Sequence, residues 1–260
     1  MLTAMLYGLL ASSGFIIGAL IGLFTTPPRR VVAGVIAFGS GILVSALTFD
    51  LMEEAFEKGH PAFAIGGFLV GALIYVLISY ALDRMAALSP KREGRDPRDV
   101  KPGARAIPES PEVAAISGTA LLVGTVLDGV PENAAIGISL TVEGSSLGLV
   151  LLGAVFLSNV PSSISSVVGM RQEGRSRRYI AAVWGVVTVA CTLATVAGYA
   201  LLGGLSSNMV SAMLALAAGG ILAMLADTMM PEAFANGGPF VAMATAVGFA
   251  CALVLTHLAG

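Results

Sequence analysis

Long apolar runs alternate with short polar breaks along almost the whole chain. A helix needs roughly 20 apolar residues to cross the hydrocarbon core of a bilayer. Eight such runs are predicted, at 3–24, 31–52, 62–82, 113–140, 146–169, 179–203, 209–231 and 238–259. Open strand edges cannot be satisfied in lipid, so all eight should be α-helices. The pattern predicts an all-α, polytopic membrane protein with eight transmembrane helices.

Composition favours the same class. Of the 260 residues, 56% are hydrophobic and 12% are charged, against about 25% charged in a soluble domain. We expect one transmembrane domain over residues 1–260, in contact with lipid and not with nucleic acid. The sequence carries no hydrolase, redox or phosphate-binding motif, so neither an enzymatic activity nor a cofactor is expected. Cys191 and Cys251 should pack in the membrane, and Trp184 should anchor a helix at the membrane interface.

Positive charges lie mostly in alternate breaks. Odd-numbered connections hold 13 of the 14 lysines and arginines, and Lys58 is the exception: Arg29 and Arg30, seven from Arg84 to Arg105, and four from Arg171 to Arg178. The positive-inside rule predicts that these connections are cytoplasmic and that both termini of this multi-pass cell-membrane protein lie outside. The polar, proline-rich stretch 84–112 is expected to be a cytoplasmic linker between the third and fourth helices.

An internal repeat relates the second and seventh predicted helices. SGILVSALTFDLMEEAFEKG (40–59) aligns with GGILAMLADTMMPEAFANG (219–237) after one single-residue gap, which places Glu54 over Glu232. The predicted topology makes these helices run in opposite directions across the membrane. We therefore expect an inverted repeat, formed by helices 1–3 and 6–8 around helices 4 and 5, as in many secondary transporters.

A second repeat, with an offset of 30 residues, marks the candidate site. LDGVPENAAIG (127–137) aligns with LSNVPSSISSV (157–167), so that Pro131 superposes on Pro161. Each proline lacks an amide hydrogen and is expected to bend its helix and free a carbonyl oxygen. If the two helices face one another, their polar side chains converge as possible cation ligands: Asp128, Glu132, Ser158, Asn159 and Ser162. Alternatively, the prolines only bend the helices, and the carboxylates form buried hydrogen bonds or are protonated.

These motifs resemble those of the ZIP (Zrt/Irt-like) metal transporters. The resemblance covers essentially all eight helices and includes VPEN, VPSS, MMPEAFANGG, LMEEAFEKG and the basic loop after the third helix. It implies import of a divalent metal into the cytoplasm through a site between helices 4 and 5. The family motif His-Asn-x-Pro-Glu-Gly corresponds here to Asp128, Gly129, Val130, Pro131, Glu132 and Asn133, and its counterpart in the next helix to residues 158–163.

The departures from the family change the expected ligands. Both motifs lack histidine, and the second has Ser162 where the family commonly has glutamate. The remaining oxygen ligands favour hard or borderline cations such as Mg²⁺, Mn²⁺ or Fe²⁺, although Zn²⁺ also accepts carboxylates. Acidic residues in the second and seventh helices extend the predicted metal path, namely Asp50, Glu54, Asp227 and Glu232.

Two other functions remain open from the sequence. One is a ZIP-like metal sensor or scaffold that has lost transport. The other is a carrier of protons or of a non-metal solute, with Asp128 and Glu132 as a proton relay. The 32 glycines allow close helix packing within a monomer or across a homodimer.

Overall fold

The computed structural model describes residues 1–87, 118–141, 147–201 and 205–259, which are helical almost throughout. The α-helices are α1 (Leu2–Phe24), α2 (Arg29–Ser45), α3 (Glu53–Lys58), α4 (Pro61–Ala87), α5 (Gly118–Ser139), α6 (Leu147–Gln172), α7 (Arg177–Leu201), α8 (Ser207–Met224), α9 (Met230–Gly237) and α10 (Val241–Ala259). Two π-helices, η1 (Ala46–Met52) and η4 (Leu225–Met229), join α2 to α3 and α8 to α9.

The predicted apolar runs correspond to these helices. Six helical stretches of the described residues are long and apolar enough to cross a membrane, and Val241–His257 is a shorter apolar helix. The helices that correspond to the second and seventh predicted runs extend further than predicted, to Lys58 and Gly237. These helices indicate an all-α protein embedded in a membrane.

Most of the predicted cytoplasmic linker lies outside the described residues. Its first residues, 84–87, belong to α4, which ends at Ala87. The helical pattern of the third run therefore continues past its apolar part into the charged sequence.

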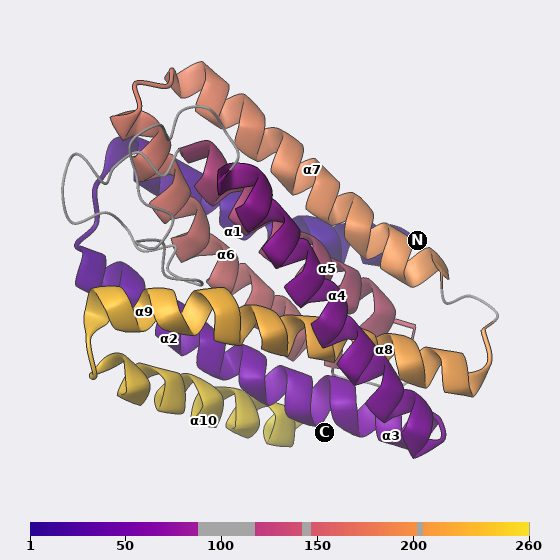
Figure 1. Cartoon of the computed structure of the whole chain (residues 1–260). Coiled ribbons are helices and arrows are strands. Elements are labelled where there is room, and N and C mark those ends of the chain that lie inside the picture. The colour runs from indigo at the N-terminus through magenta and orange to yellow at the C-terminus, as the bar shows by residue number, and fades with distance from the viewer. Residues whose placement is uncertain (88–117, 142–146, 202–204, 260) are drawn as a thin grey trace.

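Each helix packs on specific neighbours in one bundle (Figure 1). Helix α1 lies between α6 and α7, and α5 packs on α6 and α7. Helix α4 packs along α8, while α10 packs along α2. In Figure 1, α7 lies along the upper edge of the bundle and α10 along the lower edge. The two proline-containing helices, α5 and α6, are thus neighbours in the bundle.

Pairs of contacting residues give the relative directions of the helices. Along α1 and α6, Gly14 approaches Phe156 and Gly22 approaches Val167, so these two helices are parallel. Hydrogen bonds from Ser158 to Glu132 and between Thr125 and Ser166 make α5 and α6 antiparallel. The predicted topology likewise makes the first and fifth runs (α1 and α6) parallel to each other and antiparallel to the fourth (α5).

Arginines of the fifth connection contact the end of α1. Arg171, at the end of α6, donates hydrogen bonds to the carbonyls of Gly22 and Thr25 at the end of α1. The Arg177 guanidinium lies 5.7 Å from the centroid of the Phe24 ring. These contacts place the first and fifth connections side by side, as expected if both lie on one side of the membrane.

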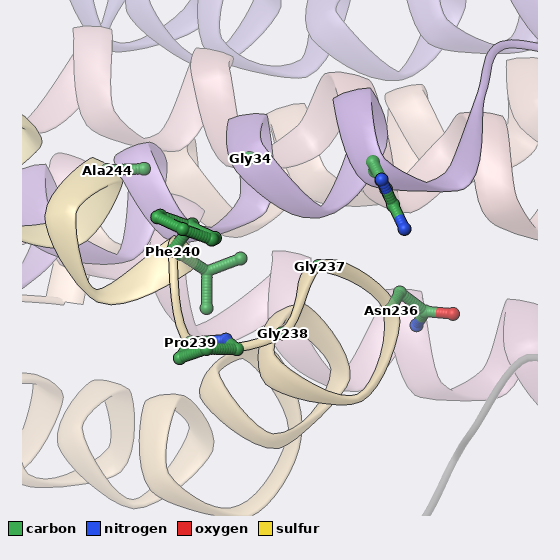
Figure 2. A pocket seen from close by; sticks show the side chains of 9 residues that line it. Gly34, Asn236, Gly237, Gly238, Pro239, Phe240 and Ala244 are labelled. Atoms are coloured by element: carbon green, nitrogen blue, oxygen red, sulfur yellow. The ribbon is translucent and has the colours of Figure 1, made fainter.

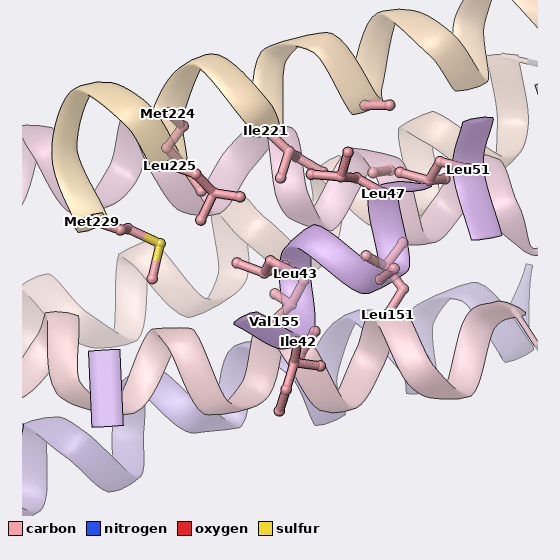
Figure 3. Close-up of a cluster of buried hydrophobic side chains, with 14 of the residues drawn as sticks. Ile42, Leu43, Leu47, Leu51, Leu151, Val155, Ile221, Met224, Leu225 and Met229 are labelled. Carbon is pink, nitrogen blue, oxygen red and sulfur yellow. The ribbon is translucent and has the colours of Figure 1, made fainter. Parts of the chain in front are cut away.

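An apolar core forms where α2 and η1 meet α6 and α8 (Figure 3). Its buried side chains include Leu43, Leu47, Leu51, Leu151, Val155, Ile221, Met224 and Leu225. In lipid the hydrophobic effect gives little drive for helices to associate, so close packing of such side chains and of glycines holds them together.

The structure corrects the interpretation of Trp184. This side chain is completely buried rather than placed at an interface, and its ring centroid lies 5.6 Å from that of Phe15. The physical reason is the contact between α1 and α7, which encloses both rings in a second cluster of buried residues. A large aromatic ring contributes much packing surface in such a place.

Candidate cation site

The prolines of the two aligned motifs lie inside helices that continue on both sides. Pro131 is in α5 and Pro161 is in α6. Polar side chains beside each proline bond to carbonyls of their own helix: Asn133 Nδ2 donates to Gly129 O, and Ser162 Oγ donates to Ser158 O. Such bonds stabilise backbone that a proline disturbs in lipid.

The two motifs meet at Glu132 and Ser158. The Oγ atom of Ser158 lies 3.2 Å from Oε2 of Glu132, to which it donates a hydrogen bond. The same hydroxyl lies 2.9 Å from the carbonyl oxygen of Val155. Both side chains are almost fully buried, with exposed fractions of 1% for Glu132 and 2% for Ser158. The two motifs therefore contact one another at these two residues.

The side chains of Asn159 and Ser162 form hydrogen bonds with backbone carbonyls rather than with Glu132. Asn159 is buried, and its Nδ2 donates to the carbonyl of Ala11 on α1 over 3.1 Å. Ser162 is half-buried, and its hydroxyl donates over 2.9 Å to Ser158 O. Both keep oxygen lone pairs that accept hydrogen bonds or bind a cation, but their donors serve helix packing.

Asp128 lies in α5 one turn before Glu132. Its side chain is outside the part of the chain that the structure describes. The predicted carboxylate pair is therefore represented in the structure by Glu132 alone.

Asp50 is the most deeply buried of the flanking acids. It lies in η1 with an exposed fraction of 1%, and within the described residues neither carboxylate oxygen has a hydrogen-bond partner. The hydroxyl of Ser45, which precedes η1, is likewise buried without a partner among the described residues. Burying polar groups without partners costs several kcal/mol, so packing stability alone gives no reason for Asp50.

The other flanking acids have different surroundings. Asp227 is half-buried in η4, and its Oδ2 accepts a hydrogen bond of 2.8 Å from Ser79 on α4. Glu232 is half-buried in the first turn of α9. Glu54 forms an ion pair with Lys58, with Oε1 and Nζ 3.4 Å apart. Within the described residues, no three Asp, Glu, His or Cys side chains converge as they would around a metal ion.

Asn133 is a buried polar residue that the sequence did not single out as part of the site. Its Oδ1 accepts hydrogen bonds from Ser12 Oγ on α1, at 3.1 Å, and from Thr195 Oγ1 on α7, at 3.3 Å. The signal in the sequence was its place in the motif, directly after Glu132, where the family has glycine. Its partners lie 121 and 62 residues away, which no local pattern reveals.

A groove of about 510 Å³ lies elsewhere, at the turn from α9 into α10 (Figure 2). Its lining includes Arg30, Asn236, Gly238, Pro239 and Phe240. Gly238 has a φ of 70°, a left-handed conformation that glycine adopts without strain. None of the predicted cation ligands lines this groove.

Comparison with known proteins adds no assignment. No protein-family model and no curated protein matches the chain.

Proposed function

We propose that this protein is a ZIP-like membrane transporter that moves a divalent metal cation into the cytoplasm. The observation that carries the proposal is the buried contact between Glu132 and Ser158, which joins the two proline motifs inside a bundle of apolar helices. A carboxylate inside a membrane protein is costly and is usually kept for a functional reason.

The chemistry of the site favours a cation with a preference for oxygen. Glu132 supplies a carboxylate, Ser158 and Ser162 supply hydroxyl oxygens, and the sequence adds Asp128 one turn before Glu132. Oxygen ligands of this kind suit Mg²⁺, Mn²⁺ and Fe²⁺. The metal is the cargo of the proposed transport and not a resident cofactor.

The inverted repeat belongs to this proposal. Each of the two aligned segments, 40–59 and 219–237, contains a π-helix, η1 in the first and η4 in the second. Short π segments within α-helices occur frequently at functional sites. The packing partners of the matched helices correspond as well. The repeat matches α1 with α7, α2 with α8, α4 with α10 and α5 with α6. Accordingly, α2 packs on α10 as α8 packs on α4, and α1 packs on α6 as α7 packs on α5. We infer that an approximate two-fold axis in the membrane plane relates the first three predicted helices (α1, α2–α3 and α4) to the last three (α7, α8–α9 and α10).

Two buried or half-buried aspartates extend the proposed route. Asp50 is in η1 and Asp227 is in η4, at the π segments of the two aligned helices. We infer that these carboxylates face the moving cation on its way to and from Glu132. The basic ends of α2, α6 and α7 mark the proposed cytoplasmic exit under the positive-inside rule.

Cation binding by the purified protein tests the proposal. Thermal stabilisation is measured with Mg²⁺, Mn²⁺, Fe²⁺ and Zn²⁺ for the wild type and for Glu132→Gln. Glu57→Gln, which neutralises an exposed glutamate, is the matched control. At least one cation should stabilise the wild type and the control but not Glu132→Gln, because a ligand that binds only the folded state stabilises it, and the stabilisation rises with its affinity. Equal stabilisation of all three proteins would refute a site at Glu132.

Uptake into vesicles, measured alongside cation binding, separates the other functions left open by the sequence. Cation binding that depends on Glu132, without uptake into vesicles, would favour a metal sensor or scaffold. Uptake of protons or of a non-metal solute, without any cation binding, would favour the second alternative.

A further inference from the structure

Asn133 connects three helices through one buried side chain. It is completely buried in α5, directly after Glu132. Its Oδ1 accepts hydrogen bonds from Ser12 on α1 and Thr195 on α7, and its Nδ2 donates to Gly129 O in its own helix at 2.8 Å. Both ends of the amide are therefore used, which fixes the side chain and the part of α5 that carries it.

Helix α1 holds the second proline motif at the adjacent residue. The carbonyl of Ala11 accepts a hydrogen bond from Asn159 Nδ2 of α6, while the hydroxyl of Ser12 bonds to Asn133 of α5. Close approach of α1 to α6 at Gly14 supports this connection, because a Cβ atom there would lie 2.5 Å from the carbonyl oxygen of Phe156. Two consecutive residues of α1 thus contact both motifs.

The rotation of α5 about its axis follows from these bonds. Consecutive residues of an α-helix point about 100° apart. When Asn133 is held toward α1 and α7, Glu132 is directed to the neighbouring face, where Ser158 of α6 bonds to it. A substitution at Asn133 removes the hydrogen bonds that fix the rotation of α5, while the carboxylate of Glu132 itself is unchanged.

We propose that Asn133, held by Ser12 and Thr195, is a positioning residue that fixes Glu132 for cation binding. The proposal rests on the proposed function, in which Glu132 binds the transported cation. The ZIP motif that this chain resembles has glycine at the position of Asn133, and glycine has no side chain with which to form these bonds. The amide network therefore belongs to this chain's own version of the site.

The first test measures Mn²⁺ affinity of the purified protein. Partners that orient a metal ligand typically change affinity by about 10- to 100-fold when they are removed. We expect a loss of about this size in Asn133→Ala and a smaller loss in Thr195→Val, which keeps the volume but removes the hydroxyl. Thr195→Ser keeps the hydroxyl and should bind like the wild type. Thr188→Val is the matched control, because the hydroxyl of the buried Thr188 donates a hydrogen bond to Trp184 O in its own helix.

A second test needs no metal and separates this proposal from the proposed function. The infrared band of the Glu132 carboxyl group is assigned from the difference between the wild type and Glu132→Gln. Ser158→Ala should shift this band, and Asn133→Ala and Thr195→Val should shift it in the same direction, since Glu132 then loses its alignment with Ser158. Thr188→Val and Thr195→Ser should leave it in place.

The outcomes are distinct. Wild-type protein that binds no cation would overturn the proposed function, while the infrared band would still decide whether Asn133 orients Glu132. An unshifted band in both Asn133→Ala and Thr195→Val would overturn the positioning role, whatever the affinity for Mn²⁺. If Asn133→Ala does not fold, the comparison of Thr195→Val with Thr195→Ser decides: a band shifted only in Thr195→Val supports the positioning role, and a band unshifted in both overturns it.

Discussion

Ser158 on α6 donates a hydrogen bond of 3.2 Å to the Oε2 atom of Glu132 on α5, and both residues are almost fully buried. The bond joins the two proline motifs across a helix interface in the middle of an apolar bundle. The contact therefore fixes the relative position of the two helices that carry the candidate cation ligands.

Removal of the Ser158 hydroxyl should weaken the site. Ser158→Ala leaves Glu132 with one donor fewer, which should lower stability by about 1–3 kcal/mol and Mn²⁺ affinity by about tenfold. Ser40→Ala is the control, because the buried Ser40 bonds to Ile36 O of its own helix. Mn²⁺ titration and thermal unfolding measure both effects. If the two variants behave alike, the contact with Glu132 has no special part in the site.

Close packing of α1 on α6 should make Gly14 intolerant of a side chain. A Cβ atom at this position would lie 2.5 Å from Phe156 O and 3.1 Å from Asn159 Cβ. Gly14→Ala should destabilise the protein by about 1–3 kcal/mol, because the backbone must move apart. Gly185→Ala has nothing within 4 Å of the new Cβ and should have no such cost. Thermal unfolding in detergent compares them, and equal stability would show that α1 and α6 are less closely packed than described.

The charge distribution predicts the orientation in the membrane. In a background without cysteine, Ser176→Cys in the fifth connection should react with a membrane-impermeant maleimide only from the cytoplasmic side. His60→Cys, in the connection between α3 and α4, should react only from outside; both positions are exposed. The two termini should be reached from outside, and the linker at 89–110 from the cytoplasm. Labelling of Ser176→Cys from outside would reverse the assignment.

Introducing the ligands typical of the ZIP family, which the sequence resembles, should change the preference of the proposed site. Asp128→His together with Ser162→Glu adds an imidazole and a second carboxylate. The double variant should favour Zn²⁺ over Mg²⁺ more strongly than the wild type, because imidazole suits zinc. Competition between the two ions for the purified protein measures the ratio. An unchanged ratio would argue that positions 128 and 162 do not contact the cation.

The helices were predictable from the sequence because an apolar run long enough to span a membrane has few alternatives to a helix. The ends of the second and seventh predicted helices were not predictable. Their last segments, EEAFEK and PEAFANG, are too polar to count as membrane spans, yet they are helical to Lys58 and Gly237. The π segments η1 and η4 have no recognised pattern in the sequence.

The candidate site was predictable only in part. The repeat of 30 residues indicated which polar side chains could converge if the two helices face one another, and the structure brings two of them, Glu132 and Ser158, into contact. Asn133 was not recognised as a connector, because its bonds to Ser12 and Thr195 depend on how distant helices pack. Trp184 was assigned to an interface from its position in the sequence, whereas the contact of α1 with α7 buries it.

Uptake by purified protein in liposomes tests the central claim most directly. Vesicles containing wild type, Glu132→Gln or the control Glu57→Gln are loaded with a metal-sensitive dye and exposed to Mn²⁺ and, separately, to Mg²⁺, Fe²⁺ and Zn²⁺. The account predicts saturable uptake of at least one of these cations by the wild type and the control, and a loss of most of that uptake in Glu132→Gln. Wild-type vesicles that take up no divalent cation, or uptake that is the same in Glu132→Gln, would contradict it.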